Sequence, residues 1–208
     1  MTRLRRATAV VVLACGLVLG TGAVASTASA GDARLDLPPS SGKRIARIFD
    51  DALRPLGLRT TRAGLQSLDS YQPDPEGRHL AVYVEPIDEI TDEQYVANFL
   101  QVARVYLPST FKRWTDLKSF DVCQEPPPTE DSNVAPPPVT QLQATRAGAG
   151  AVRWARTTLE ELLVEAAEAG QDPTAGKRQR MFVYFADRLD AVPELVAARA
   201  AAAKSLDR

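Results

Sequence analysis

Two short segments of the chain end in glutamate followed by proline and carry the carboxylates best placed for chemistry. Residues 79–86 (HLAVYVEP) and 119–126 (SFDVCQEP) each predict a strand, with Glu85 and Glu125 at the strand ends. In the topology predicted below these two strands run parallel, so both carboxylates would emerge at the same edge of the sheet. Such a pair could supply a general acid and a general base, or bind Ca²⁺. The sequence favours the simpler interpretation, in which both are solvated charges near a helix start.

The same segments contain His79, the only histidine of the chain, and Cys123, one of its two cysteines. A thiolate beside an imidazole forms a nucleophilic dyad, so this pair is the other candidate for catalysis. His79 begins its strand whereas Cys123 lies near the end of the other, so we expect them at different heights on the sheet. A core cysteine and a structural histidine are therefore the favoured interpretation. An exposed Cys123 would instead indicate a disulfide between two chains.

Other catalytic and cofactor motifs are incomplete or missing from the sequence. The segment 170–178 (GQDPTAGKR) resembles a phosphate loop, but it has one residue too many between its glycines and Arg178 where Ser or Thr would hold Mg²⁺. The GxSxG, HExxH and EF-hand patterns do not occur. With one histidine, two cysteines and a net charge of −1, the composition excludes a zinc module, a disulfide scaffold and a basic field for nucleic acid. We therefore expect no cofactor, no metal and no nucleic-acid partner.

Residues 1–30 predict a secretory signal peptide. Three arginines precede an apolar run, which ends in the small residues Ala28, Ser29 and Ala30 just before the polar pair Gly31-Asp32. This is the pattern that a signal peptidase cleaves, so we expect cleavage between Ala30 and Gly31. The high arginine and alanine content is typical of a bacterial genome rich in GC. The sequence therefore predicts a bacterial protein that is secreted or otherwise extracytoplasmic.

Cys15 provides an alternative to free secretion. Residues 12–15 (VLAC) resemble a lipobox, in which an acylated Cys15 would become the N-terminus and anchor the protein to a membrane. Leu13 is bulky for its position, and the residues after Cys15 are apolar where a polar tether is expected. Secretion is therefore the favoured interpretation, and a lipid anchor at Cys15 is the only membrane contact that we expect.

Hydrophobic periodicity and turn residues predict alternating helices and strands after a polar lead at residues 31–40. Helices are expected over 41–54, 91–107, 157–170 and from 191 onward, and strands over 58–65, 79–85, 119–125, 139–145 and 181–186. Thr91 and Gln94 fit a capping box, and Pro108 is expected to end the second helix. The segment 126–138 contains six prolines and is expected to form an extended loop.

From residue 79 the predicted order is β-α-β-β-α-β, followed by a helix. This order is that of a ferredoxin-like sandwich, in which two helices cover one face of an antiparallel sheet. We therefore expect residues 41–208 to form one α+β domain with additional N- and C-terminal helices. The proline-rich loop 126–138 would connect the two middle strands as a rigid spacer, with a docking element as the alternative.

A fold of this kind does not specify an activity, so function must be argued from side chains. The sequence favours an exported, non-enzymatic binding domain for a protein or a cell-envelope ligand. The alternative is a secreted hydrolase that uses Glu85 with Glu125, or Cys123 with His79. An enzyme requires these side chains within hydrogen-bond reach of each other in an open pocket. A Cys123 buried among apolar side chains, with the glutamates apart in water, would argue against it.

Overall fold

The computed structural model of the chain describes residues 36–67, 78–127, 136–171 and 180–208. By internal contacts the chain divides into residues 1–34 and residues 35–208, and every described residue belongs to the second unit. The predicted signal peptide, its cleavage site and Cys15 lie outside the described residues, as does most of the proline-rich loop. Within the described part of the chain, no helix is both long enough and apolar enough to span a membrane.

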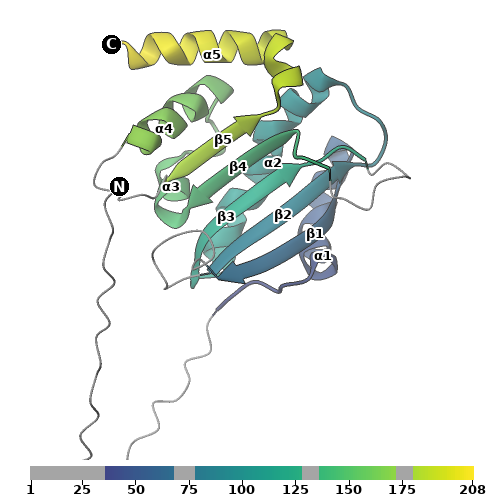
Figure 1. The fold of residues 1–208 in the computed structure, drawn as a ribbon. Coiled ribbons are helices and arrows are strands. Elements are labelled where there is room, and N and C mark those ends of the chain that lie inside the picture. The colour runs from purple at the N-terminus through teal and green to yellow at the C-terminus, as the bar shows by residue number, and fades with distance from the viewer. Residues whose placement is uncertain (1–35, 68–77, 128–135, 172–179) are drawn as a thin grey trace, which may run out of the picture. The chain divides into compact units, whose positions relative to one another are not determined.

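The described residues form a mixed five-stranded sheet with five α-helices, which confirms the α+β class (Figure 1). The elements are α1 (Gly42–Leu53), β1 (Leu58–Ser67), β2 (Arg78–Pro86), α2 (Asp92–Arg113), β3 (Leu117–Gln124), β4 (Thr140–Thr145), α3 (Arg146–Ala151), α4 (Leu159–Gln171), β5 (Met181–Phe185) and α5 (Pro193–Leu206). Short 3₁₀ turns follow α1 and precede α5.

The order of the strands differs from the ferredoxin-like expectation. The sheet order is β1-β2-β3-β4-β5, so each strand lies beside its neighbour in sequence. Only β2 and β3 are parallel, and they pair directly, with α2 as the crossover between them. A ferredoxin-like sheet would instead place another strand between these two parallel strands. Strand β1 pairs with the other edge of β2 and occupies it. Strand β5 therefore pairs with β4 instead, as an antiparallel strand at the end of the sheet.

One face of the sheet packs against α1 and α2, which lie together on that side (Figure 1). The strand residues on this face are Leu80, Val82, Val84, Phe120, Val122, Leu142 and Ala144, all buried. Phe49 of α1 contacts the ring of Tyr106 in α2 at a centroid distance of 4.4 Å, and Tyr106 stacks on Phe120 at 5.7 Å. The side chains of the opposite sheet face are therefore directed away from this helical layer.

Helix α2 has the predicted start and a different end. The capping box is present, since the Thr91 hydroxyl accepts from the Gln94 N–H at 3.3 Å and the Gln94 side chain accepts from the Thr91 N–H at 2.7 Å. The prediction that Pro108 ends the helix is wrong, because α2 continues to Arg113. Pro108 lies on the exposed side, where a carbonyl that loses its partner can be hydrated. Continuation of the helix buries Phe111 in the core.

Helix α3 was not predicted, and its first residue connects three parts of the fold. The Arg146 guanidinium donates to four backbone carbonyls that end α2 and start β3, those of Phe111, Trp114, Thr115 and Leu117, at 2.7 to 2.9 Å. A capping box begins α4: the Thr158 N–H donates to the Glu161 carboxylate, and the Glu161 N–H donates to the Thr158 hydroxyl. Asp190 pairs with Arg199 and does not cap α5, which begins at Pro193 after Val192.

Candidate functional site

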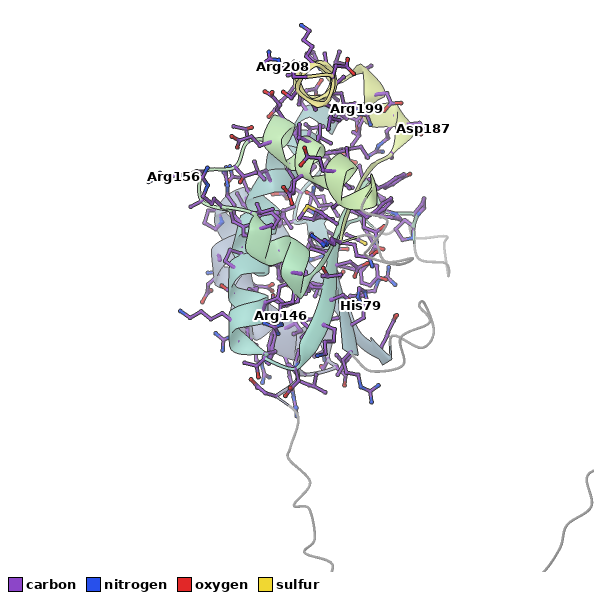
Figure 2. The ribbon with its side chains drawn as sticks, turned by 90° about the vertical axis from the view of Figure 1, so that its left-hand side faces the viewer. His79, Arg146, Arg156, Asp187, Arg199 and Arg208 are labelled. Carbon is purple, nitrogen blue, oxygen red and sulfur yellow. The ribbon has the colours of Figure 1, made fainter. Side chains whose placement is uncertain are left out.

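The sheet face directed away from α1 and α2 carries mostly polar side chains, and we call it the polar face. It consists of Arg59, Arg62, Gly64 and Gln66 on β1; His79, Ala81, Tyr83 and Glu85 on β2; Ser119, Asp121 and Cys123 on β3, with Glu125 directly after it; Gln141 and Gln143 on β4; and Phe182 and Tyr184 on β5. Figure 2 labels His79 on the side of the sheet away from α2. All four residues singled out from the sequence therefore lie on one face.

Glu85 and Glu125 lie at the same end of two parallel strands, as the sequence pattern predicts. Each carboxylate is paired with an arginine from β1. Arg59 donates to Glu85 through Nε at 2.8 Å and Nη2 at 2.5 Å, and Arg62 contacts both oxygens of Glu125. Both glutamates are buried, whereas the arginines are about half-exposed. The structure therefore brings the carboxylates together as the inner partners of two ion pairs.

A bulge in β1 places both arginines on this face. The pairing register of β1 with β2 shifts between Thr60 and Arg62. In a regular strand, side chains alternate, so residues 59 and 62 would point to opposite faces. The extra residue turns the Arg62 side chain to the same face as Arg59, while Thr60 faces the core and contacts the Tyr106 hydroxyl at 2.8 Å. Neither arginine was considered as a site residue from the sequence.

His79 contacts two residues of the neighbouring strand that sequence reasoning missed. Its Nδ1 lies 2.8 Å from the Ser119 hydroxyl, and its Nε2 lies 3.3 Å from Asp121 Oδ1. The second Asp121 oxygen accepts from the Gln141 amide at 2.8 Å. His79, Ser119 and Asp121 are each less than one-tenth exposed. A serine, a histidine and an aspartate in this order are the components of a nucleophilic relay, with the histidine between the other two.

Cys123 does not contact His79. His79 pairs with Ser119, and Cys123 lies four residues further along β3, opposite Tyr83. The thiol donates to Asp121 at 3.9 Å. Burial, together with the nearby charges of Asp121 and Glu125, raises the pKa of the Cys123 thiol far above its usual value. The thiolate that nucleophilic attack requires is therefore strongly disfavoured. Cys123 is a free, buried cysteine, but its neighbours are polar rather than the apolar ones expected.

One residue from each strand forms a row across the middle of the polar face, which we call the central row. The register places Arg62 beside Tyr83, Tyr83 beside Cys123, Cys123 beside Gln141 and Gln141 beside Tyr184. The Arg62 guanidinium lies 3.9 Å from the centre of the Tyr83 ring, a cation–π contact. Burial, with Asp121 and Cys123 nearby, raises the pKa of Tyr83, so its hydroxyl stays protonated and can donate. Every member of the row except Cys123 is at least partly exposed.

Comparisons with protein-family models, with curated proteins and with solved structures found no match for this chain. Function is therefore argued from the geometry of the polar face. Among the residues that the structure describes, no group of three or more His, Cys, Asp or Glu side chains is arranged to hold a metal ion. The polar face combines two chemical features. Its buried polar groups are hydrogen-bonded to neighbouring side chains, and the arginine, tyrosine and amide side chains of the central row are accessible to solvent.

Proposed function

We propose that the protein is an exported, non-enzymatic binding domain that contacts a protein partner through the central row. The observation that supports this proposal is that the buried carboxylates of the polar face are held by neighbouring side chains, while the central row is accessible to solvent. Glu85, Glu125 and Asp121 are buried and engaged by neighbouring side chains, so they hold the face in one geometry. Such preorganisation lowers the entropy that a partner must remove on binding.

The composition of the central row favours a protein as the partner. Arginine and tyrosine are enriched at the centres of protein interfaces, where tyrosine offers a large contact area at a small entropic cost. Arg62 uses Nε and Nη2 for Glu125, so its remaining N–H groups can donate to a partner. The Gln141 amide and the Tyr184 ring extend the same row over the last two strands.

Covalent capture followed by a binding measurement tests this proposal. A photo-crosslinking residue is placed at Gln141 and, as a control, at the exposed Arg47 on helix α1, in protein produced by its native host. We expect one captured protein at position 141 that is missing at position 47. The purified partner should then bind Tyr184→Ala at least about 30-fold more weakly than wild type, as expected for a hot-spot residue. Equal capture at both positions, or equal affinity for wild type and Tyr184→Ala, would contradict the proposal.

Export is a separate part of the proposal and has its own test. It is supported by the basic start, apolar run and Ala28-Ser29-Ala30 pattern of residues 1–30. Mass spectrometry of the protein that the host releases should find Gly31 at the N-terminus. An acylated Cys15 would show that the protein is lipid-anchored instead, and an intact N-terminus on protein inside the cell would contradict export.

A secreted hydrolase is the second candidate, and the contacts of His79 with Ser119 and Asp121 favour it. In this case His79 would accept the Ser119 proton while the serine oxygen attacks, and Asp121 would hold the ring. A fluorophosphonate probe tests the idea, because the Ser119 oxygen would bond to phosphorus, fluoride would leave and His79 would take the proton. Labelling of Ser119 that is lost in His79→Gln, with the fold intact, would support the hydrolase. Labelling that is absent, or no stronger than that of the exposed Ser205, would leave the binding domain as the function.

A further inference from the structure

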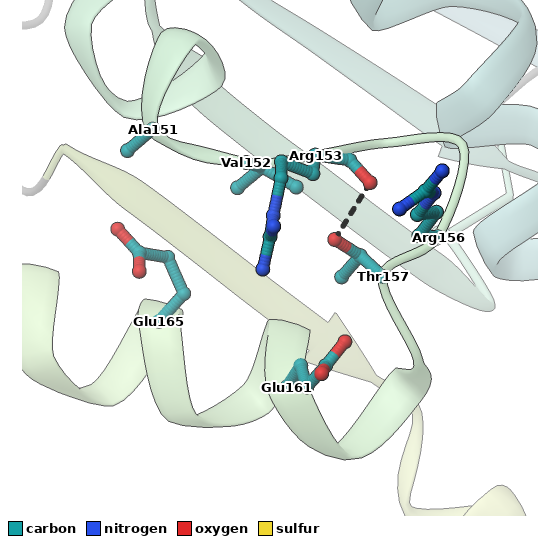
Figure 3. Close-up of a pocket in the computed structure, with 7 residues that line it drawn as sticks. All are labelled: Ala151, Val152, Arg153, Arg156, Thr157, Glu161 and Glu165. Carbon is teal, nitrogen blue, oxygen red and sulfur yellow. Dashed lines mark hydrogen bonds between the residues drawn. The ribbon is translucent and has the colours of Figure 1, made fainter.

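A cavity of about 410 Å³ lies between α4 and the loop that joins α3 to α4 (Figure 3). Its lining consists of Ala151, Val152, Arg153, Arg156, Thr157, Glu161 and Glu165, none of which belongs to the polar face. The volume falls within the range of about 300–1,000 Å³ that is typical of small-molecule sites. This cavity is therefore large enough for a small ligand and independent of the function proposed above.

The loop wall of the cavity is fixed by contacts with the core. Arg104 of α2 donates to the Trp154 carbonyl and to the Thr157 carbonyl, both at 2.9 Å. The Trp154 ring is buried, and its N–H donates to the Ala149 carbonyl at 2.9 Å. The Thr157 hydroxyl donates to the Arg153 carbonyl at 3.1 Å. The backbone that carries the arginines of the cavity is thus held in place before any ligand binds.

The charges that line the cavity face each other without forming a direct pair. Arg153 projects from the loop toward α4, between Glu161 and Glu165 (Figure 3). The two glutamates are four residues apart, so they lie on one side of the helix. With the residues that the structure describes, Arg153 and Glu165 form no ion pair, and Glu161 accepts only from the Thr158 N–H at 2.9 Å. Arg156 adds a second guanidinium to the loop wall.

We propose that this cavity binds a small zwitterion with a free ammonium and a free carboxylate, such as an amino acid or a short peptide. The carboxylate of the ligand pairs with Arg153 and Arg156, and its ammonium pairs with Glu165 and Glu161. A simple anion would be repelled by the two glutamates, and a simple cation would be repelled by the two arginines. A ligand that carries an ammonium at one end and a carboxylate at the other can pair with both walls at once.

Calorimetric titration with triglycine tests the proposal on the whole protein. N-acetyl-triglycine and triglycine amide serve as the matched ligands, since each lacks one of the two charges. We expect triglycine to bind and each blocked peptide to bind at least about tenfold more weakly, because each loses a charge-assisted contact. Failure of triglycine to bind, or equal binding of the blocked peptides, would overturn the proposal.

Charge-neutral variants of the two walls provide the second measurement. Arg153→Gln and Glu165→Gln should each weaken triglycine binding at least about tenfold, whereas Glu168→Gln on the same helix should not change it, because Glu168 does not line the cavity. Arg153 and Glu168 are exposed and Glu165 is partly exposed, so the fold should tolerate all three changes, which circular dichroism checks. Unchanged affinity in the folded Arg153→Gln or Glu165→Gln variant would refute the assignment.

Discussion

The two partners of the Arg62–Glu125 ion pair should respond unequally to substitution. The Glu125 side chain is 6% exposed and the Arg62 side chain is 45% exposed. Arg62→Met keeps most of the aliphatic stem but removes the guanidinium that lies over the Tyr83 ring, which leaves a buried carboxylate without its partner. Glu125→Gln removes the charge from the buried side and leaves a guanidinium that water can hydrate.

The burial of each side chain determines how much stability its substitution costs. Removing one member of a fully buried pair costs about 3–5 kcal/mol, whereas an exposed pair is worth about 0.2–1 kcal/mol. Because Arg62 is half-exposed, water can partly reach the carboxylate that Arg62→Met leaves behind, so we expect a loss of about 2–3 kcal/mol. This figure includes about 0.5 kcal/mol for the cation–π contact with Tyr83. Glu125→Gln should cost less than about 1 kcal/mol, since its amide oxygen can still accept from Arg62.

Urea unfolding of wild type, both single variants and the double variant measures these free energies. In the double variant the loss should be smaller than the sum of the two single losses, because the unpaired carboxylate is then absent. Equal losses in the two single variants, or a larger loss in Glu125→Gln, would refute the idea that the buried carboxylate dominates.

Three further predictions concern packing, the thiol and the connection between α2 and β3. A Cβ on Gly148 would lie 2.3 Å from the Arg180 carbonyl oxygen, so Gly148→Ala should lose at least about 2 kcal/mol in urea unfolding. Gly150→Ala in the same helix meets no atom within 4 Å and should gain up to about 1 kcal/mol, so equal effects of the two would contradict this packing. Cys123 should resist alkylation at pH 8.5 until urea unfolds the chain. Since its pKa is raised in the folded protein, stability should fall as the pH rises above about 8.5, and a Cys123→Ala variant should lack this fall. Arg146→Met removes the guanidinium donor from four carbonyls, of which that of Trp114 still accepts from the Leu117 N–H, and should cost about 2–4 kcal/mol in thermal unfolding, whereas a loss below about 1 kcal/mol would show that water replaces the guanidinium.

Most of the helices and strands could be predicted because their signals are local. The Thr91–Gln94 capping box and the Thr158–Glu161 box are read from four consecutive residues, and both are present. Local signals failed where packing decides the outcome. Pro108 is a helix breaker by propensity, but the burial of Phe111 continues α2 beyond it. Helix α3 contains two glycines and lacks an apolar stripe, so no periodicity indicates it.

The candidate site was only partly predictable. The Glu-Pro pattern and the order of the elements correctly indicated that Glu85 and Glu125 end parallel strands at one edge of the sheet, but not that the two strands pair directly. Ser119 and Asp121 could have been found from their alternation with Cys123 along one strand, which places all three on the same face. Their contacts with His79 could not, because these depend on the pairing register between β2 and β3.

By itself, the sequence determined most of the strands and helices and which carboxylates share a sheet edge, because these follow from periodicities along the chain. Tertiary structure alone decided the partners of those carboxylates. The arginines come from β1, which pairs with the free edge of β2, and the bulge after Thr60 turns Arg62 to the polar face. A shift of one residue in the pairing register of β1 would move each of its side chains to the opposite face of the sheet. No sequence pattern within β1 specifies which register forms. The register of β1 therefore gives each of the two buried glutamates an arginine partner on the polar face.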